Sequence, residues 1–256
     1  MSEFKNQNVL ITGGTSGMGL VTAELFASEG ANVFISGRNK EQGKEAVQTL
    51  SRFSGKNEYI PCDVANQEEV KSMLTYLDSA VGGVDIAVNN AGITSKSHAA
   101  LVDFAEEEWK NIINVNLNGL FYCMKYELRA MLAKGKGIIV NNSSVAGLVS
   151  MPMQAAYCAS KSAVIALTES AAIDYAQKNI RINAIAPGPV MGGMNSLERL
   201  NANPERTAKK LNLTAMHRFG EPMEIANAIA WLCSSKSSFI TGATIAVDGG
   251  FSSGKW

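Results

Sequence analysis

The chain has 256 residues, of which 46% are hydrophobic and 18% charged, and its 23 basic side chains balance its 23 acidic ones. This length and apolar content predict one globular domain with a large core. A net charge of zero, without a long run of Lys or Arg, argues against a nucleic-acid partner. Because no apolar stretch approaches roughly 18 residues and the N-terminus does not resemble a signal peptide, we expect no membrane span and a cytoplasmic protein.

Short apolar runs alternate with segments of helical periodicity along the chain. The runs are, in order, NVLIT, NVFIS, EYIPC, VDIAVNN, GIIVNNSS, IRINAIAP and TIAVDGG. VLIT and GIIV are apolar nearly throughout, as expected of strands buried on both faces. The alternation predicts an α/β fold, a Rossmann-type doubly wound parallel sheet of about seven strands with helices on both faces. We expect residues 1–256 to form a single domain.

One irregular segment, residues 188–222, follows the sixth apolar run. Gly, Asn and Pro interrupt an amphipathic pattern there. A long insertion after a strand of an open parallel sheet lies at the carboxyl edge, where ligands bind. We therefore expect this segment to be a mobile substrate lid.

The four cysteines are Cys62, Cys123, Cys158 and Cys233. They are far apart and lack the paired spacing of a zinc site or a redox dithiol. We expect reduced, mostly buried thiols and no metal.

A glycine-rich turn, TGGTSGMG from Thr12 to Gly19, joins the first apolar run to an amphipathic helix. Glycines at 13, 17 and 19 let the backbone approach a pyrophosphate, and the helix N-terminus offers free N–H groups. These features favour a dinucleotide ligand. The spacing is not the standard GxGxxG, and a tight strand-to-helix connection is the alternative.

The second run ends in ISGRN, which places Gly37 and Arg38 where an NAD site often has a carboxylate for the ribose 2′-hydroxyl. A guanidinium there can pair with a 2′-phosphate. This favours NADP over NAD. The alternative is that Arg38 is a solvated surface residue.

The stretch AAYCASKSAV, residues 155–164, places Tyr157 and Lys161 four residues apart. On a helix the two side chains share one face and can reach the same small volume. Taken alone, the pair could equally be a half-buried tyrosine and a lysine whose stem covers apolar surface.

Five motifs in order resemble those of the short-chain dehydrogenase/reductase family, and the resemblance spans nearly the whole chain. They are TGGTSGMG; Asp63 and Val64 in PCDVAN; NNAG at 89–92; Asn116 in NVNLNG; and Ser144 in NNSSVAG together with Tyr157 and Lys161 in YCASK. The family spacing between serine and tyrosine selects Ser144 over Ser143. INAIAPGPV and ITGATIAVDGG resemble the strand that leads to the nicotinamide pocket and the C-terminal strand.

The resemblance implies a catalytic tetrad of Asn116, Ser144, Tyr157 and Lys161. Tyr157 would exchange a proton with the substrate oxygen, and Ser144 would orient that oxygen. Lys161 would hold the nicotinamide ribose and, with the oxidised cofactor, lower the pKa of Tyr157 by about three. Asn116 would support a water chain to the lysine. The cofactor contacts it implies are Gly13, Thr15, Ser16, Gly17, Met18, Gly19, Arg38, Asp63, Val64, Asn90, Ala91, Gly92, Tyr157, Lys161, Pro187, Gly188 and Val190.

Each role has a structural alternative. Ser144 could satisfy a turn, Asn116 could hold two segments together, and Asp63 could cap the next helix. Gly192 stands where many family members have a threonine that contacts the cofactor. How the lid closes over the cofactor therefore does not follow from the resemblance. Residues near the expected substrate site are Met151, Met153, Gln154, Met191 and Met194, either substrate contacts or core fillers.

We therefore expect an NADP-dependent oxidoreductase acting on a small or medium apolar ketone or secondary alcohol. An NAD-preferring alcohol dehydrogenase and a cofactor-binding regulatory or scaffold protein without turnover are the alternatives, and a sugar epimerase is disfavoured by the short C-terminal half. The partner is a small-molecule substrate. The resemblance also implies a homo-oligomer, commonly a homotetramer.

Overall fold

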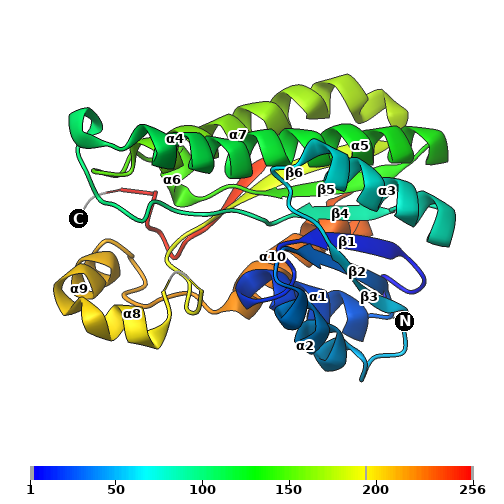
Figure 1. Cartoon of the computed structure of the whole chain (residues 1–256), viewed down its shortest axis with the longest axis horizontal. Coiled ribbons are helices and arrows are strands. Elements are labelled where there is room, and N and C mark those ends of the chain that lie inside the picture. The colour runs from blue at the N-terminus through cyan, green and yellow to red at the C-terminus, as the bar shows by residue number, and fades with distance from the viewer. Residues whose placement is uncertain (1–2, 194, 255–256) are drawn as a thin grey trace.

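The computed structural model describes residues 3–193 and 195–254, and its strands form one parallel sheet (Figure 1). The strands are β1 (Asn8–Thr12), β2 (Asn32–Gly37), β3 (Asn57–Pro61), β4 (Ile86–Asn89), β5 (Gly137–Asn142), β6 (Ile180–Pro187) and β7 (Thr244–Val247). Their order across the seven-stranded sheet is β3-β2-β1-β4-β5-β6-β7. The predicted doubly wound α/β fold is confirmed.

Helices cover both faces of the sheet. They are α1 (Gly17–Ser28), α2 (Lys40–Leu50), α3 (Gln67–Val81), α4 (Glu106–Ile113), α5 (Gly119–Lys134), α6 (Val145–Leu148), α7 (Ala155–Tyr175), α8 (Leu197–Ala202), α9 (Pro204–Asn212) and α10 (Pro222–Cys233). Short 3₁₀ turns lie at Leu101–Asp103, Ala176–Lys178 and Ser235–Ser237, and a π-helical turn lies at Asn114–Asn118. Figure 1 shows α3, α5 and α7 on one side of the sheet and α1, α2 and α10 on the other. None of the described helices has the length and apolar character needed to cross a membrane.

The core has two halves, one on each face of the sheet. Leu10 and Phe34 pack among α3, α5 and α7, whereas Val9 and Ile11 pack against the helices of the opposite face. Successive strand side chains point to opposite faces, so a strand covered on both sides needs apolar residues at nearly every position. This requirement explains the unbroken apolar runs of the sequence.

The chain reverses its direction of winding at β1. It passes from β1 to β2 and β3 on one side, then returns to β4 on the other side. In a doubly wound sheet, ligands bind in the crevice beyond the carboxyl ends of the strands at this switch point. Thr12 pairs with Asn89, and Asn89 with Asn141, so polar side chains end these neighbouring strands.

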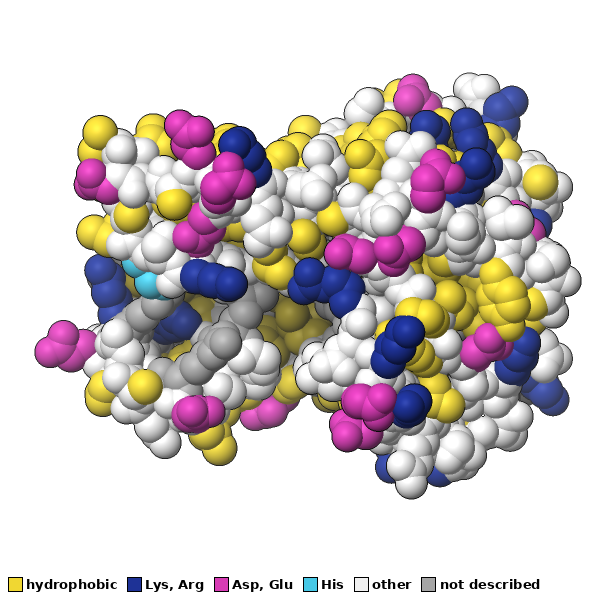
Figure 2. Space-filling view, viewed as in Figure 1, with side chains coloured by type: hydrophobic (Ala, Val, Ile, Leu, Met, Phe, Trp, Pro, Cys, Tyr) yellow, Lys and Arg dark blue, Asp and Glu magenta, His cyan; other side chains and the backbone are white. Residues whose placement is uncertain are grey.

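The segment 188–222 contains α8 and α9, two helices that the interrupted sequence pattern did not resolve. Its base is closed by a bridge in which Met191 N donates to the Gly220 carbonyl and Gly220 N to the Pro189 carbonyl, both at 2.9 Å. Figure 2 shows a depression beside the α8–α9 pair, with hydrophobic side chains in it and basic side chains near its rim.

Candidate active site

The glycine turn after β1 is shaped by close contacts. Gly13 has φ +63°, and a Cβ there would lie 2.9 Å from Cα of Ala91. The side chain of Asn90 fixes the turn by donating to the carbonyls of Thr12 and Gly13 at 3.2 and 3.0 Å. Only glycine combines this left-handed backbone with so close an approach.

The start of α1 leaves room and donors for an anion. Gly17 has φ +54°, and a Cβ there would meet nothing within 4 Å. Ser16 occupies the N-cap position without a side-chain capping bond. First-turn N–H groups of a helix lack intrahelical acceptors and attract phosphate oxygens. These residues therefore fit the pyrophosphate of a dinucleotide.

Arg38 and Asp63 lie together beyond β2 and β3. The guanidinium of Arg38 is 3.9 Å from Oδ2 of Asp63, and the Arg38 side chain is 64% exposed. Asp63 Oδ1 accepts from the backbone N–H of Ala65 at 3.0 Å. The alternative that Asp63 caps α3 is wrong, because Asn66 does so, accepting from the N–H groups of residues 68 and 69.

Tyr157 and Lys161 face each other on α7. Nζ of Lys161 lies 5.9 Å from the centre of the Tyr157 ring, and both residues are buried. Nζ donates to the backbone carbonyl of Asn142 at 2.7 Å. The Lys161 ammonium is therefore held by the end of β5. This excludes the alternative of a lysine whose aliphatic stem only covers apolar surface.

Ser144 and Ser143 have different partners. Ser143 Oγ donates to the backbone carbonyl of Lys161 at 2.7 Å, inside the fold. Ser144 begins α6, accepts from Ala146 N at 3.1 Å, and its hydroxyl also hydrogen-bonds the Tyr157 phenol. The geometry thus favours Ser144 as the serine beside the tyrosine, although it satisfies a turn as well.

Asn116 lies in the π-helical turn between α4 and α5. Its Oδ1 accepts from Ile93 N at 2.8 Å, and its Nδ2 donates to the Ile93 carbonyl at 2.9 Å and to Ser160 Oγ at 3.1 Å. A Cβ built on Gly92 would lie 3.3 Å from Asn116 Oδ1 and 3.4 Å from Lys161 Nζ. Asn116 therefore ties the loop after β4 to α7 and lies close to the lysine.

Burial dominates the electrostatics of the pair on α7. It raises the pKa of Tyr157, against which the hydrogen bond with Ser144 acts to lower it, and Cys158 adds a smaller upward effect. Burial lowers the pKa of Lys161 to about 8. The predicted lowering of the Tyr157 pKa includes the charge of the oxidised cofactor, and it stays a prediction; in the protein alone, desolvation sets the direction of the shift.

The residues near the expected substrate position are not core fillers. Met153 is 55% exposed with φ +58°, and Met151, Gln154 and Met191 are half-buried. Cys158 Sγ accepts from Met151 N at 3.4 Å. Met194 lies outside the described residues.

The backbone conformation explains why position 192 is glycine and not the threonine found in many family members. Gly192 has φ +86°, and its N–H and carbonyl exchange hydrogen bonds with Asn195 at 3.2 and 2.8 Å. A β-branched threonine is disfavoured in this conformation. The turn therefore takes a form that the hydroxyl residue would strain.

Three residues that sequence reasoning missed also belong to the site's framework: Asn142, Ser160 and Glu127. The only available signal was the repeated Asn-Asn pair at the ends of two apolar runs, residues 89–90 and 141–142. Asn142 Nδ2 donates to Asn90 Oδ1 at 3.0 Å, which joins the ends of β4 and β5.

The cysteines and the possible metal ligands show whether the described residues could form a redox or metal site. The cysteines are free; Cys62, Cys123 and Cys233 are buried and Cys158 is half-buried, as predicted. Among the described residues, no group of three or more His, Cys, Asp or Glu side chains could hold a metal ion.

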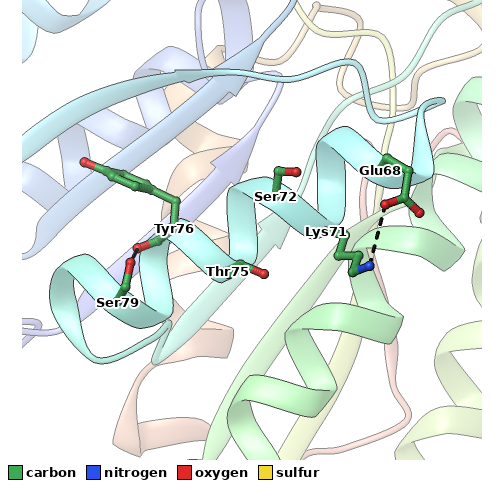
Figure 3. Close-up of a pocket in the computed structure, with 6 residues that line it drawn as sticks. All are labelled: Glu68, Lys71, Ser72, Thr75, Tyr76 and Ser79. Atoms are coloured by element: carbon green, nitrogen blue, oxygen red, sulfur yellow. Dashed lines mark hydrogen bonds and ion pairs between the residues drawn. The ribbon is translucent and has the colours of Figure 1, made fainter.

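A shallow groove elsewhere follows the outer side of α3. Figure 3 shows its lining residues Glu68, Lys71, Ser72, Thr75, Tyr76 and Ser79 along that helix. Lys71 pairs with Glu68 at 3.6 Å, and Ser79 Oγ donates to the Tyr76 carbonyl at 2.9 Å. None of the four candidate catalytic residues lines it.

Comparison with known proteins identifies the relatives of this chain. A family model described as "Enoyl-(Acyl carrier protein) reductase" matches residues 13–252. The chain is 42% identical over 253 residues to a 2,5-dichloro-2,5-cyclohexadiene-1,4-diol dehydrogenase of Sphingobium indicum, covering 98% of this chain and 99% of the relative. It is 36% identical to a cyclohexanol dehydrogenase of Acinetobacter sp., covering 98% and 97%.

Solved structures agree with these relatives. Levodione reductase superposes with a TM-score of 0.92 at 31% identity, covering 98% of this chain and 99% of the other. NAD⁺-bound xylitol dehydrogenase gives a TM-score of 0.92 at 32% identity, covering 97% and 100%. The chain belongs to the short-chain dehydrogenase/reductase family and is an NAD(P)-dependent oxidoreductase that acts on alcohols or ketones.

Proposed function

We propose that this enzyme interconverts a cyclic, largely apolar secondary alcohol and its ketone, with NADP preferred over NAD and Tyr157 as the general acid and base. The observation that carries the proposal is the buried group formed by Tyr157, Ser144 and Lys161 at the carboxyl edge of the sheet. The nicotinamide cofactor, when bound, supplies or accepts the hydride.

Tyr157 donates a proton to the carbonyl oxygen during reduction and takes it back from the alcohol during oxidation. Its raised pKa keeps the phenol protonated at neutral pH, which suits the reductive direction. Ser144, already hydrogen-bonded to the phenol, holds the substrate oxygen. The Lys161 ammonium, fixed on the Asn142 carbonyl, is the nearby positive charge that favours proton release in the oxidative direction.

Asn116 supports the site by position. Its amide holds the loop at Ile93 and the hydroxyl of Ser160, and a Gly92 Cβ would lie between it and Lys161. Proton resupply to Lys161 through water at Asn116 is part of the proposal.

The dinucleotide would be held along the switch-point crevice. The glycine turn (Gly13, Thr15, Ser16, Gly17, Met18, Gly19) takes the pyrophosphate. Asp63, Val64, Asn90, Ala91 and Gly92 take the adenine and the cofactor floor. Tyr157 and Lys161 take the nicotinamide ribose, and Pro187, Gly188 and Val190 take the nicotinamide.

The preference for NADP rests on Arg38. Gly37 carries no side chain, and the exposed Arg38 guanidinium is available to a 2′-phosphate. Asp63, 3.9 Å from that guanidinium, is the competing anion and limits the expected selectivity. Initial rates with NADPH and NADH at equal concentrations test this part on its own.

The substrate class rests on the lining and on the relatives. Methionines 151, 153 and 191 adapt to irregular apolar shapes. Two relatives are named for alcohols of six-membered carbon rings, a cyclohexadiene diol and cyclohexanol. We propose the segment 188–222 as the lid over this substrate and the chain as a single domain.

A homo-oligomer, a homotetramer by family resemblance, and a cytoplasmic location stay predictions. Exposed apolar side chains of Phe121 on α5 and Ile173 on α7 support self-association. Light scattering after size exclusion measures the mass.

The deciding experiment compares wild type with Tyr157→Phe on cyclohexanol, cyclohexanone and a panel of larger cyclic ketones. We expect turnover with NADP(H) in the wild type and a loss of about 10²-fold or more in the variant. Tyr175→Phe, on the same helix outside the site, is the matched control. Full activity in Tyr157→Phe would contradict the proposed role.

A further inference from the structure

Glu127 of α5 is a carboxyl group that the proposed chemistry does not use. It is completely buried, yet among the described residues no Lys or Arg forms an ion pair with it. An ionised carboxylate placed in a core without a cation is strongly destabilising. Its charge state therefore needs an explanation.

The contacts of Glu127 and Asn89 leave one oxygen of each side chain without a hydrogen-bond partner. Asn89 Nδ2 donates to Glu127 Oε2 at 2.9 Å, so the amide and the carboxyl are joined. The other oxygens of the same two groups, Glu127 Oε1 and Asn89 Oδ1, are both buried and without a hydrogen-bond partner. A proton on Oε1 turns one acceptor into a donor and satisfies both atoms.

We propose that Glu127 is held as a neutral carboxylic acid that donates from Oε1 to Asn89 Oδ1, and that this acid–amide pair makes it a positioning residue for Lys161. Burial raises the pKa of Glu127 to about 7, while the hydrogen bond from Asn89 lowers it, which agrees with the neutral form. The positioning part rests on the proposed role of Lys161.

A chain of buried hydrogen bonds leads from this pair to α7. Asn89 Nδ2 also donates to Asn141 Oδ1 at 3.1 Å, and Asn141 Nδ2 donates to Thr168 Oγ1 at 2.9 Å. Thr168 Oγ1 in turn donates to the carbonyl of Val164, one turn after Lys161, at 2.7 Å. The pair therefore connects α5, β4, β5 and α7.

The same strand ends hold the lysine head. Asn142, the residue after Asn141, accepts from Lys161 Nζ through its backbone carbonyl at 2.7 Å. If Glu127 lost its bond to Asn89, the ends of β4 and β5 would be free to shift, and the Asn142 carbonyl with them. A misplaced lysine would alter both rate and pH dependence.

Burial and the hydrogen bond from Asn89 determine the protonation of Glu127, because its other neighbours carry no charge. The amides of Asn89 and Asn141 from the sheet and the hydroxyl of Thr168 from α7 are uncharged. The titratable neighbour is Cys123 on α5, whose pKa burial raises well above its ordinary value. A neutral thiol neither stabilises nor repels a carboxylate.

Infrared spectroscopy tests the proton without using activity. We expect the wild type at pH 6 to show the C=O stretch of a buried protonated carboxylic acid, which Glu127→Gln removes and the control Glu169→Gln, an exposed carboxylate on α7, does not. The band should be lost as the pH rises past about 7. A wild-type spectrum without this band would overturn the neutral acid.

Kinetics test the positioning. Gln retains an acceptor and a donor in the same shape, so Glu127→Gln should keep kcat within about threefold. Glu127→Leu lacks both and should lose about tenfold or more in kcat with a shifted pH profile of kcat/KM. If Glu127→Gln and Glu127→Leu lost kcat equally, a charged carboxylate would be required and the proposal would be overturned. Unchanged kinetics in Glu127→Leu would overturn the positioning role as well.

If Glu127→Leu does not fold, two measurements still test the proposal. The infrared band reports the proton on Glu127, and the kcat of Glu127→Gln shows whether a neutral side chain of the same shape keeps the activity. Failure of the proposed function is seen separately: turnover retained in Tyr157→Phe would contradict that function and leave the band in place.

Discussion

Replacing Lys161 by Met is expected to make the folded protein more stable at neutral pH while it abolishes turnover. Burial lowers the pKa of Lys161 from 10.5 to about 8, because the ammonium loses hydration that the Asn142 carbonyl only partly replaces. At about 1.4 kcal/mol per pH unit, the difference between 10.5 and about 8 is a cost of about 3 kcal/mol. Met also removes the 2.7 Å hydrogen bond to Asn142, worth about 1.5–3 kcal/mol. The net gain is therefore about 0–2 kcal/mol.

The dependence on pH has a definite sign. Between pH 8 and 10.5 the unfolded chain binds the Lys161 proton and the folded chain does not, so wild-type stability rises with pH across this window. The cost is fully present below pH 8 and absent above 10.5. The stability of Lys161→Met relative to wild type should therefore fall by about 3 kcal/mol from pH 7 to pH 10.5, so that wild type becomes the more stable protein.

Urea unfolding followed by circular dichroism, with no nucleotide added, measures this difference. Lys178→Met, at an exposed position, is the matched control and should change the free energy of unfolding by less than about 0.5 kcal/mol. A Lys161→Met variant whose stability relative to wild type stays the same at pH 7 and pH 10 would show that burial does not perturb this ammonium, and the reasoning would fail.

Four other substitutions separate the remaining parts of the site. Arg38→Ala should weaken NADPH binding by about tenfold and leave NADH binding within about twofold, since it removes one exposed charge-assisted contact; equal effects on both cofactors in calorimetric titrations would refute the 2′-phosphate assignment. Ser144→Ala should lower kcat by about 10²-fold and, because it removes the N-cap of α6, cost about 1 kcal/mol of stability. Ser143→Ala should also cost about 1 kcal/mol, because it removes the bond to the Lys161 carbonyl, but should keep kcat within a few-fold. A larger loss of kcat in Ser143→Ala than in Ser144→Ala would favour the other serine. Gly192→Thr should cost about 1–2 kcal/mol because of φ +86°, and a variant as stable as wild type with tighter NADPH binding would refute the strain argument.

The strands and their order of appearance could be predicted because burial on both faces leaves an apolar run at each of them. The edge that holds the site followed from the same pattern, since a parallel sheet brings its carboxyl ends together. The bounds of α8 and α9 could not be predicted because both helices are short and their pattern is broken by Gly, Asn and Pro. The π-helical turn that carries Asn116 was missed for another reason, because it continues a helical periodicity without a break.

Individual roles were less accessible. The sequence could not show that Ser143 bonds inward to the Lys161 carbonyl while Ser144 bonds the phenol, because adjacent residues differ only in direction. The upward shift of the Tyr157 pKa in the protein alone could not be predicted, since sequence spacing shows a nearby cation but not the extent of burial. Glu127 stands in a helix among charged residues, where a carboxylate normally faces solvent.

Lys161 and Glu127 together show how the site and the core share one framework. Each is an ionisable group whose ordinary charged form is disfavoured by burial, and each bonds to one of the paired asparagine segments, Lys161 to the Asn142 carbonyl and Glu127 to the Asn89 amide. The two segments end neighbouring strands and are joined by Asn89 to Asn141 and by Asn142 to Asn90. An apolar replacement at either strand end would leave buried donors and acceptors without partners at both groups. The asparagines are thus the connection through which the buried acid Glu127 and the buried amine of Lys161, at the proposed reacting centre, are held in one arrangement.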